Sequence, residues 1–527
     1  MDANRKWYEV IVVGAGPTGL VLALSLAKLG VAVRIVDKAA LPGTTSRALA
    51  VQSRTLELYR PLGLARDVVE AGLRMSAINL WVAGRHVKRV VLGGMGRDLS
   101  PFPFPLVYPQ DEHERLLIEH LRAAGVEVER PLEVTGFEEI AGGVRVRLAG
   151  PRGEETCEAA WLAGCDGARS VVREALQAGF PGGTYQHLFY VADVEATGPV
   201  MNRELNVALD AADLLAVFAL KGEGRARLIG IVREDAAAKQ APTWDDVSGR
   251  ILARLGIDVK RVNWFSTYHV HHRVAHFFRS GRAFLLGDAA HIHSPVGGQG
   301  MNTGIGDAVN LAWKLAAVLR GAARASLLDT YAVERMAFAR RLVASTDRAF
   351  TFVTHDGPLA RFVRLRVVPV LFPTLFSSER WRRFFFRIIS QIDVNYRVEP
   401  FNAGVAGKVR GGDRLPWVPP EDGDPRHDNF APLDALDWQV HVYGTPSAEL
   451  AEFCAGRGIA LNAFPWREGP MHAAGLALGA AYLVRPDGYV ALADSTARPA
   501  TLAAYLDGHG LRPLAADSGG RNTPPVR

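Results

Sequence analysis

The stretch from Gly281 to Leu315 combines four features of a ligand site: a buried strand, a carboxylate, a glycine-rich turn and a helix start. Ala283 to Leu286 is a short apolar run typical of a buried strand, and Asp288 after it can accept hydrogen bonds from ribose or ribityl hydroxyls. The glycines that follow Pro295 let backbone approach a ligand closely. A helix from about Met301 directs unpaired N–H groups towards the same place. These features predict a site for a flat, electron-rich ring system.

A second glycine-rich turn lies near the N-terminus. Tyr8 to Val13 is typical of a buried strand, the turn Gly14 to Gly19 (GAGPTG) opens a helix to about Leu29, and Val31 to Val36 is the next strand, followed by Asp37. An acidic residue about 20 positions after the first glycine, in this order of elements, predicts a dinucleotide site. The glycines admit a pyrophosphate to the helix start, and Asp37 binds the adenosine ribose. The pattern alone does not separate FAD from NAD.

The sequence between these two motifs and after them indicates several domains. Short strand-like runs fill residues 177–280 and predict a sheet-rich domain that is inserted into a discontinuous nucleotide-binding domain, residues 1–176 and 281–400. The predicted strands are His187 to Val194, Leu205 to Leu209, Leu214 to Leu220 and Ala226 to Val232. Helices are expected from Asp307 to Ser390.

The C-terminal part is predicted to be a small α/β unit, residues 430–516, after a linker at 401–429 that is rich in Gly, Pro and Asp. Residues 517–527 are expected to be a disordered tail. The predicted elements are strand Trp438 to Tyr443, helix Ser447 to Ala455, strand Ile459 to Phe464, a hairpin around Pro486-Asp487-Gly488, and helix Pro499 to Leu506.

The bulk properties are those of an ordinary enzyme. The 527 residues are 48% hydrophobic and 22% charged, and the net charge of +6 is spread along the chain, so nucleic acid is not an expected partner. The three cysteines form no CxxC pair, which favours a reducing, cytoplasmic location. We find no secretory pattern and no run of about twenty apolar residues, so an integral membrane protein is not expected.

One segment, Arg361 to Ile389, is rich in both arginine and aromatic residues. It fits a membrane-surface stretch that collects a lipophilic substrate. The favoured interpretation is a set of helices that cover the core, with arginines extending outward.

Three motifs in order along the chain resemble the single-component (class A) flavoprotein monooxygenases, the para-hydroxybenzoate hydroxylase family. They are GAGPTG at Gly14 to Gly19, CDGARSVVR at Cys165 to Arg173, and GDAAHIHSP at Gly287 to Pro295. The match covers about the first 400 residues, and three ordered motifs are far more specific than one. The C-terminal unit resembles the thioredoxin-like extension of the phenol-hydroxylase-type members, although it lacks CxxC. The implied fold is α/β: a Rossmann-like (GR2-type) FAD-binding domain with an inserted β-sheet substrate domain and a thioredoxin-like C-terminal domain.

The resemblance implies bound FAD, with NAD(P)H and O₂ as co-substrates and a small aromatic substrate, and it leaves room for a homodimer. The residues expected at the FAD site are Gly14, Gly16, Pro17, Thr18, Gly19, Asp37, Lys38, Arg47, Gln110, Asp166, Gly287, Asp288, Pro295, Gly298, Gly300, Met301 and Asn302. The chain departs from the family pattern at Gly306, where Gln is more familiar, and at Ser294, where Pro is.

The implied reaction is hydroxylation of a phenolic or polycyclic aromatic substrate through a flavin C4a-hydroperoxide. Epoxidation or Baeyer–Villiger insertion on the same scaffold remains an alternative, as does a non-catalytic flavin protein that sequesters an aromatic intermediate. The sequence does not identify the substrate, the choice of NADH or NADPH, or the catalytic base.

Three residues on the strand before Gly281 are candidates for that base: Tyr268, His269 and His271. Alternation places the two histidines on one face of the strand and Tyr268 on the other. The local abundance of histidine suggests a metal site, but no carboxylate or thiolate stands at ligand spacing, so no metal is expected.

Overall fold

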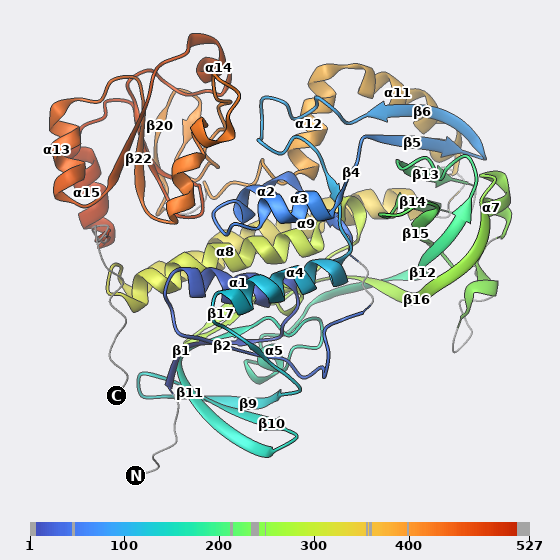
Figure 1. Cartoon of the computed structure of the whole chain (residues 1–527), viewed down its shortest axis with the longest axis horizontal. Coiled ribbons are helices and arrows are strands. Elements are labelled where there is room, and N and C mark those ends of the chain that lie inside the picture. Colours follow the sequence, from blue (N-terminus) through green and yellow to red (C-terminus); the bar gives the residue numbers. More distant parts are fainter. Residues whose placement is uncertain are drawn as a thin grey trace. The chain divides into compact units, whose positions relative to one another are not determined.

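The computed structural model describes residues 7–44, 48–210, 214–232, 242–247, 249–354, 357, 361–397 and 400–513 (Figure 1). The chain divides into two compact units. The first contains Met1–Ala312 and Tyr331–Asp393, and the second contains Trp313–Thr330 and Val394–Arg527.

The first sheet of the first unit has a parallel core. Strand β1 (Trp7–Val13) runs parallel to both of its neighbours, β2 and β11, and β11 runs parallel to β18. The carboxyl ends of these strands therefore share one edge of the sheet, where open α/β sheets bind ligands. The other strands are β2 (Val33–Val36), β8 (Val128–Glu129), β9 (Glu133–Ile140), β10 (Gly143–Gly150), β11 (Gly153–Gly164), β17 (Arg279–Ser280) and β18 (Ala283–Leu285).

Helix α1 (Pro17–Lys28) follows β1 directly, as predicted. Its continuous apolar sequence is buried from Gly19 to Leu26, and it lies beside α4, as Figure 1 shows. The remaining helices of this part are α2 (Ser53–Tyr59), α3 (Ala65–Ala71), α4 (Gln110–Ala123), α5 (Val171–Ala175), α8 (Gly300–Leu319) and α9 (Asp329–Thr354). A small sheet joins β3 (Ala50–Val51), β7 (Leu106–Val107) and β4 (Leu73–Arg74).

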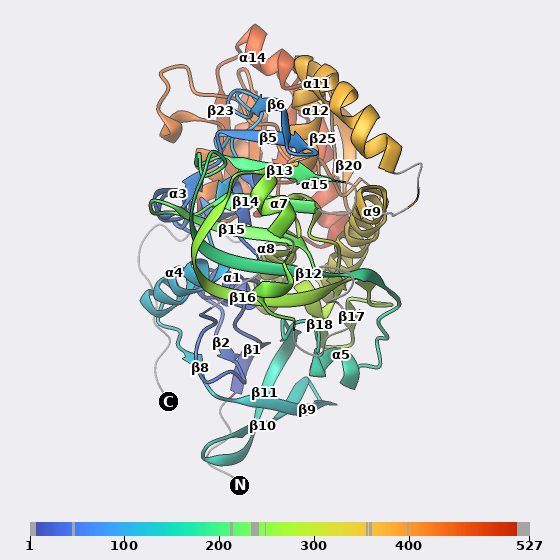
Figure 2. The same cartoon turned by 90° about the vertical axis from the view of Figure 1, so that its right-hand side faces the viewer.

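The second sheet has eight strands in the order β19-β16-β12-β15-β14-β13-β5-β6, and Figure 2 shows the long, bent pair β12 and β16 across it. The four strands expected within 177–280 are confirmed. The strands are β5 (Ala77–Val82), β6 (Arg85–Val91), β12 (Gly182–Thr197), β13 (Leu205–Leu209), β14 (Leu214–Ala219), β15 (Arg225–Ile231), β16 (Asp258–Val274) and β19 (His291–Ile292). The predicted domain boundary at residue 176 does not separate the two sheets. Strand β5 pairs in parallel with β13, and β6 pairs with β5, so both earlier strands belong to the second sheet.

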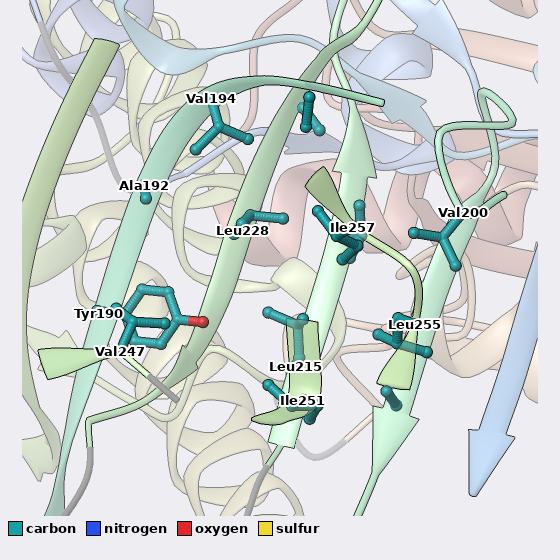
Figure 3. Packing of buried hydrophobic residues seen from close by; sticks show 14 of the residues in the cluster. Tyr190, Ala192, Val194, Val200, Leu215, Leu228, Val247, Ile251, Leu255 and Ile257 are labelled. Carbon is teal, nitrogen blue, oxygen red and sulfur yellow. The ribbon is translucent and has the colours of Figure 1, made fainter. Parts of the chain in front are cut away.

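The two faces of this sheet differ, and we call them outer and inner. The outer face carries the core shown in Figure 3, in which Tyr190, Leu215 and Leu228 pack against Ile251 of helix α7 (Gly249–Arg254). The inner face contributes Phe218 and Ile229 to a cluster with Leu49 and with Val107 of β7. The inner face therefore packs against β7 and the residues just before β3.

The arginine-rich segment forms helices, as the favoured interpretation expects. Fewer of their side chains are buried than a role in covering the core would require. No residue of α11 (Val368–Ser377) is buried, and Phe386 alone is buried in α12 (Glu379–Ile389). Among the described residues, no helix is long and apolar enough to cross a bilayer.

The second unit contains a six-stranded sheet in the order β21-β20-β25-β24-β22-β23. The linker prediction for 401–429 is wrong at its start, because β20 (Ala403–Ala406) pairs in parallel with β25 and in antiparallel with β21 (Val409–Arg410). The tail at 517–527 lies outside the described residues. The other elements are β22 (Gln439–Tyr443), α13 (Ala448–Gly456), β23 (Ala460–Phe464), α14 (Glu468–Ala473), β24 (Ala481–Val484), β25 (Val490–Asp494) and α15 (Pro499–His509).

Candidate active site

The glycine turn after β1 combines tight backbone packing with one open position. Gly14 has a φ of 98°, and a Cβ there would lie 2.9 Å from the Cα of Asp166. A Cβ at Gly19 would clash with the carbonyl oxygen of Gly14. A Cβ at Gly16, by contrast, would meet no atom within 4 Å. Helix α1 begins at Pro17 with no acidic residue in its first turn and no side-chain cap, so its N-terminus suits an anionic group.

Asp37 follows β2 and spans the same turn. Its Oδ2 accepts a hydrogen bond from the N–H of Ala15 at 2.7 Å, and its Oδ1 accepts one from the N–H of Ala39 at 2.8 Å. Arg130 pairs with Oδ1 at 3.1 Å, while the buried Nε of Arg130 has no hydrogen-bond partner. Sequence reasoning missed Arg130, because only the pairing of β8 with β2 brings it beside Asp37.

Three further residues predicted to contact FAD are Lys38, Arg47 and Gln110. Lys38 is exposed, and Arg47 lies outside the described residues. Gln110 begins α4, where its amide donates to Oε1 of Glu114 at 2.8 Å. Burial raises the pKa of Glu114, and Arg130 partly offsets that effect. The Gln110–Glu114 pair therefore lies near the Asp37 end of the site.

Asp166 follows β11 and lies against Gly14. Its Oδ2 accepts a hydrogen bond from the N–H of Val172 at 3.2 Å, but its buried Oδ1 has no partner. Burial raises the pKa of this carboxyl group. A buried acceptor without a protein donor is the kind of group that a bound hydroxyl or amide can satisfy.

The turn after β18 joins three elements. Gly287 has a φ of 57°, and a Cβ there would lie 2.7 Å from Oγ1 of Thr18 on α1. Its N–H donates to Oδ2 of Asp307 on α8 at 3.0 Å. The next residue, Asp288, is exposed on this turn. The structure thus brings Thr18, Gly287 and Asp288 together, as the sequence predicts.

Asp307 anchors this junction. His291 approaches its Oδ2 at 2.7 Å, and Nε of Arg335 donates to its Oδ1 at 2.6 Å. Burial disfavours the charged carboxylate, but Arg335 and His291 together lower the pKa of Asp307. A Cβ at Gly306 would lie 3.1 Å from Nη2 of Arg335, so the unusual glycine at 306 makes room for this guanidinium.

The second glycine loop runs from Pro295 to the start of α8. Gly297 and Gly298 have φ values of 77° and 63°, and a Cβ at Gly298 would lie 2.6 Å from Cβ of Ala50. Helix α8 begins at Gly300, so Met301 falls in its first turn and the expected helix start is confirmed to within one residue. The positive end of the helix dipole at this turn again suits a negatively charged ligand edge.

Asn302 uses its whole side chain within the protein. Its Nδ2 donates to the carbonyl oxygens of Ala50 and Gly298 at 2.9 and 2.8 Å. Its Oδ1 accepts from the N–H of Gln52 at 2.9 Å and from Oγ1 of Thr55 at 2.7 Å. An amide has two donors and two acceptor sites, so this side chain holds the loop in place and has none left for a ligand.

His293 was not singled out as a site residue from the sequence. Its Nδ1 lies 2.8 Å from the carbonyl oxygen of Ser294, which makes Nδ1 the protonated nitrogen. Its buried Nε2 has no partner and lies 3.8 Å from where a Cβ on Gly300 would be. Burial lowers the pKa of His293 to about 4, so the imidazole is a neutral acceptor beside the start of α8.

A buried ion pair on the inner face of the second sheet lies close to the second glycine loop, which runs from Pro295 to Gly300. Arg227 donates to both carboxylate oxygens of Asp193 at 2.6 and 2.7 Å and to the carbonyl oxygen of Ala48 at 3.4 Å. Ala48 leads into Ala50, which contacts Gly298. The inner face and the loop are therefore adjacent.

The three candidate bases fall on different faces. Tyr268 lies on the inner face and packs near Phe189, with ring centroids 6.1 Å apart. His269 pairs with Leu188 of the outer-face core and is exposed, and His271 contacts Oγ1 of Thr184 at 2.8 Å. Of the three, Tyr268 alone lies on the face that meets the glycine loop. No group of three or more metal-ligand side chains occurs among the described residues.

The residues present fit an extended dinucleotide. The open position at Gly16 and the uncapped start of α1 suit its phosphates, the unpaired Oδ1 of Asp166 provides an acceptor between them, and the loop at Gly298 provides a surface for a flat ring. The Gly14, Asp37, Asp166 and Gly287 positions follow strands β1, β2, β11 and β18 at the same edge of the first sheet, and the Gly298 loop follows β19 of the second sheet.

Comparison with known proteins gives the same result. The family model described as "FAD binding domain" matches residues 7–346. The 6-methylpretetramide 4-monooxygenase of Streptomyces rimosus is 34% identical, over 98% of this chain and 97% of that protein. Among solved structures, the OxyS anhydrotetracycline hydroxylase from Streptomyces rimosus has a TM-score of 0.78 at 29% identity, covering 97% of this chain and 100% of that chain. The Diels-Alderase PyrE3 has a TM-score of 0.73 at 28% identity, covering 96% and 100%.

The chain therefore belongs to the FAD-binding-domain family of flavin-dependent monooxygenases, within the class A aromatic hydroxylases. Its cofactor is FAD, and NAD(P)H and O₂ are its co-substrates.

Proposed function

We propose that this monooxygenase hydroxylates a phenolic, polycyclic aromatic compound held between the inner face of the second sheet and the loop from Pro295 to Gly300. The observation that carries this proposal is the contact path from Arg227 through Ala48 and Ala50 to Gly298. It places an aromatic and aliphatic sheet face beside the loop that suits the flavin ring. Inner-face residues that are not fully buried and are available to an aromatic substrate are Phe218, Ile229, Ile231 and Tyr268.

The proposed FAD site extends along the edge of the first sheet. The adenosine ribose lies at Asp37 and Arg130, the pyrophosphate at Gly16 and the start of α1, and the ribityl chain between Asp166 and Asp288. The ring lies along Gly298 to Met301. Arg47, Lys38 and Gln110 remain proposed contacts of the phosphate and ribityl region, and Asn302 acts by holding the loop.

When bound, FAD supplies the redox chemistry, taking hydride from NAD(P)H and delivering activated oxygen to the substrate. The protein's part is binding, orientation and exclusion of water. The start of α8 would stabilise negative charge on a ring bound beside it by about 0.3–2 kcal/mol. The neutral imidazole of His293 beside them adds no positive charge of its own at neutral pH.

A substrate panel tests this function. The purified holoprotein is mixed with NADH or NADPH and with 6-methylpretetramide, anhydrotetracycline or 4-nitrophenol, and NAD(P)H consumption is compared with product mass. We expect a tetracyclic phenol to give a product heavier by one oxygen atom, with one NAD(P)H consumed per product. Product from 4-nitrophenol alone would contradict the polycyclic assignment. The position of the new oxygen separates hydroxylation from epoxidation and Baeyer–Villiger insertion.

A second function is favoured by one specific observation. PyrE3, named a Diels-Alderase, shares 28% identity over nearly the whole chain. A protein that binds flavin without net oxidation would change or sequester its ligand with no consumption of NAD(P)H or O₂. Oxygen-electrode measurements in the same panel therefore distinguish the two functions.

We also propose domain assignments. Residues 1–176 and 281–393 form the FAD-binding domain, apart from Trp313–Thr330, which falls in the second unit, and apart from β5, β6 and β19, which complete the substrate-binding sheet. The second unit has a βαβ element followed by a ββα element, with the strand order β23-β22-β24-β25, and this supports a thioredoxin-like fold. Its cysteine, Cys454, is buried and free, so we assign the domain a structural role.

The cellular location and assembly complete the proposal. Cys157, Cys165 and Cys454 are all buried and free, which supports a reducing compartment such as the cytoplasm. A homodimer is proposed, and light scattering of the purified protein tests it.

A further inference from the structure

Three titratable side chains from three elements meet beside the proposed substrate site. The hydroxyl of Tyr185 on β12 donates a hydrogen bond to Oδ1 of Asp347 on α9. Nδ1 of His272 on β16 lies 3.7 Å from the same oxygen. The rings of Tyr185 and His272 are in edge contact, with centroids 4.9 Å apart.

This cluster reaches from the substrate side of the sheet to solvent. Tyr185 packs against the inner-face cluster that contains Phe189 and Tyr268. Asp347 follows Thr346, whose carbonyl oxygen accepts a hydrogen bond from Oγ of Ser294 at 3.3 Å, so the cluster is also next to the loop that begins at Pro295. The side chains of Asp347 and His272 are 39% and 30% exposed, which gives a proton an exit to water.

We propose that Tyr185 is a catalytic residue that takes the phenolic proton of the substrate, and that Asp347 and His272 act through it as a proton relay. This inference rests on the proposed function, because a relay of this kind serves a substrate that must ionise before it is attacked by oxygen. It assigns the carboxylate of Asp347, acting through the hydroxyl of Tyr185, as the base that the sequence leaves open.

The proton transfer balances within the three side chains and water. The substrate O–H bond breaks as its proton passes to the oxygen of Tyr185. The original Tyr185 proton moves to the carboxylate of Asp347, and Asp347 passes a proton to His272 or to water. The substrate is left as phenolate, Tyr185 is unchanged, and one proton reaches solvent.

The charges around the relay favour proton transfer through Tyr185 while its side chain stays neutral. Burial raises the pKa of Tyr185, and the carboxylate of Asp347 raises it further, so the phenol is not itself ionised at neutral pH. Further titratable or charged side chains on the same elements are His269, His271 and Arg273 on β16 and Arg348, which follows Asp347 on α9. His271 contacts Thr184 on the outer face and is therefore not part of the relay.

The test is the pH profile of hydroxylation for Tyr185→Phe and Asp347→Asn, measured with the panel phenol that gives product. Removing a general base typically costs on the order of 100-fold or more in rate. We expect kcat to fall by about 100-fold in Tyr185→Phe at a pH below the phenol's own pKa. The loss should shrink as the pH rises above that pKa, because the substrate then arrives already ionised.

Two controls separate a relay from a structural role. Thr184→Val removes a neighbouring hydroxyl on the same strand and should leave the profile unchanged. FAD content and NAD(P)H oxidation without substrate should match the unaltered protein in all three variants. Asp347→Asn keeps the test available if Tyr185→Phe folds poorly, because Asp347 is partly exposed.

Each outcome decides the matter. A loss that alkaline pH rescues in both relay variants supports the proposal. An unchanged profile, or a loss of equal size at every pH, overturns it. If the unaltered protein forms no oxygenated product with any phenol, the proposed function fails instead, and that result is visible before any variant is made.

Discussion

Asn302 donates a hydrogen bond of 2.9 Å to the carbonyl oxygen of Ala50, a residue 252 positions earlier in the chain. The same amide group also bonds Gly298, Gln52 and Thr55, so it ties the start of α8 to strand β3 and to α2. The geometry of the second glycine loop therefore depends on one buried side chain.

Replacing Asn302 by Leu should destabilise the protein and weaken FAD binding together. The substitution leaves several buried backbone and hydroxyl groups without partners, and we expect the free energy of unfolding to fall by about 2–5 kcal/mol. Thermal unfolding and the FAD content of the purified protein measure the two effects. Asn263→Ala, at an exposed position on β16, is the control. An unchanged melting temperature in Asn302→Leu would show that the hydrogen bonds of the Asn302 side chain are not needed for stability.

Gly298→Ala should remove activity through contact as well as through backbone strain. The positive φ alone costs about 1–2 kcal/mol. A Cβ there would also lie 2.6 Å from Ala50 and displace the loop. Gly125→Ala provides the matched control, since Gly125 also has a positive φ but a Cβ there meets nothing within 4 Å. Equal FAD content and turnover in the two variants would contradict a role for this loop.

Gly16→Ala should separate folding from cofactor binding. A Cβ at Gly16 meets no protein atom, so the melting temperature of the FAD-free protein should change little. FAD affinity, measured by quenching of flavin fluorescence, should fall by more than about tenfold, because the methyl group occupies the place assigned to the pyrophosphate. Gly14→Ala, which clashes with the backbone of Cys165 and Asp166, should instead lose stability. If Gly16→Ala bound FAD normally, the pyrophosphate would lie elsewhere.

Acid should destabilise the protein partly through buried histidines. Burial lowers the pKa of His441 to about 3, whereas an unfolded histidine titrates near 6.5. Between these values the unfolded chain binds more protons, so the stability contributed by neutral His441 is complete above about pH 6.5 and is lost as the pH falls towards 3. His441→Phe should flatten the dependence of melting temperature on pH in this window. His269→Gln, at an exposed site, should not, and an equal slope in both variants would argue against this assignment.

Local sequence patterns predicted the parts of the fold that depend on near neighbours. The strand, turn and helix around Gly14 lie where the apolar runs place them, and the hairpin at Pro486 to Gly488 follows from its turn residues. The start of the supposed linker was missed, because β20 is a four-residue strand among glycines and gains its stability from pairing with β25.

The candidate site shows the same division. The glycine positions could be proposed from the sequence because close backbone approach needs glycine, whereas Asp166 was proposed only through the family resemblance. Arg130 was not, since its meeting with Asp37 depends on strands far apart in sequence. The relay of Tyr185 with Asp347 was invisible for the same reason: its partners are 162 positions apart.

The pairing of β5 with β13 has a consequence for how this enzyme can be taken apart. The eight-stranded second sheet is assembled from strands at 77–91, 182–274 and 291–292, so no single stretch of the gene encodes it. A fragment limited to 177–280 would leave the edge of β13 bare, and exposed strand edges promote aggregation. Chimeras that exchange substrate preference between relatives should therefore carry residues 77–91 along with the later segment.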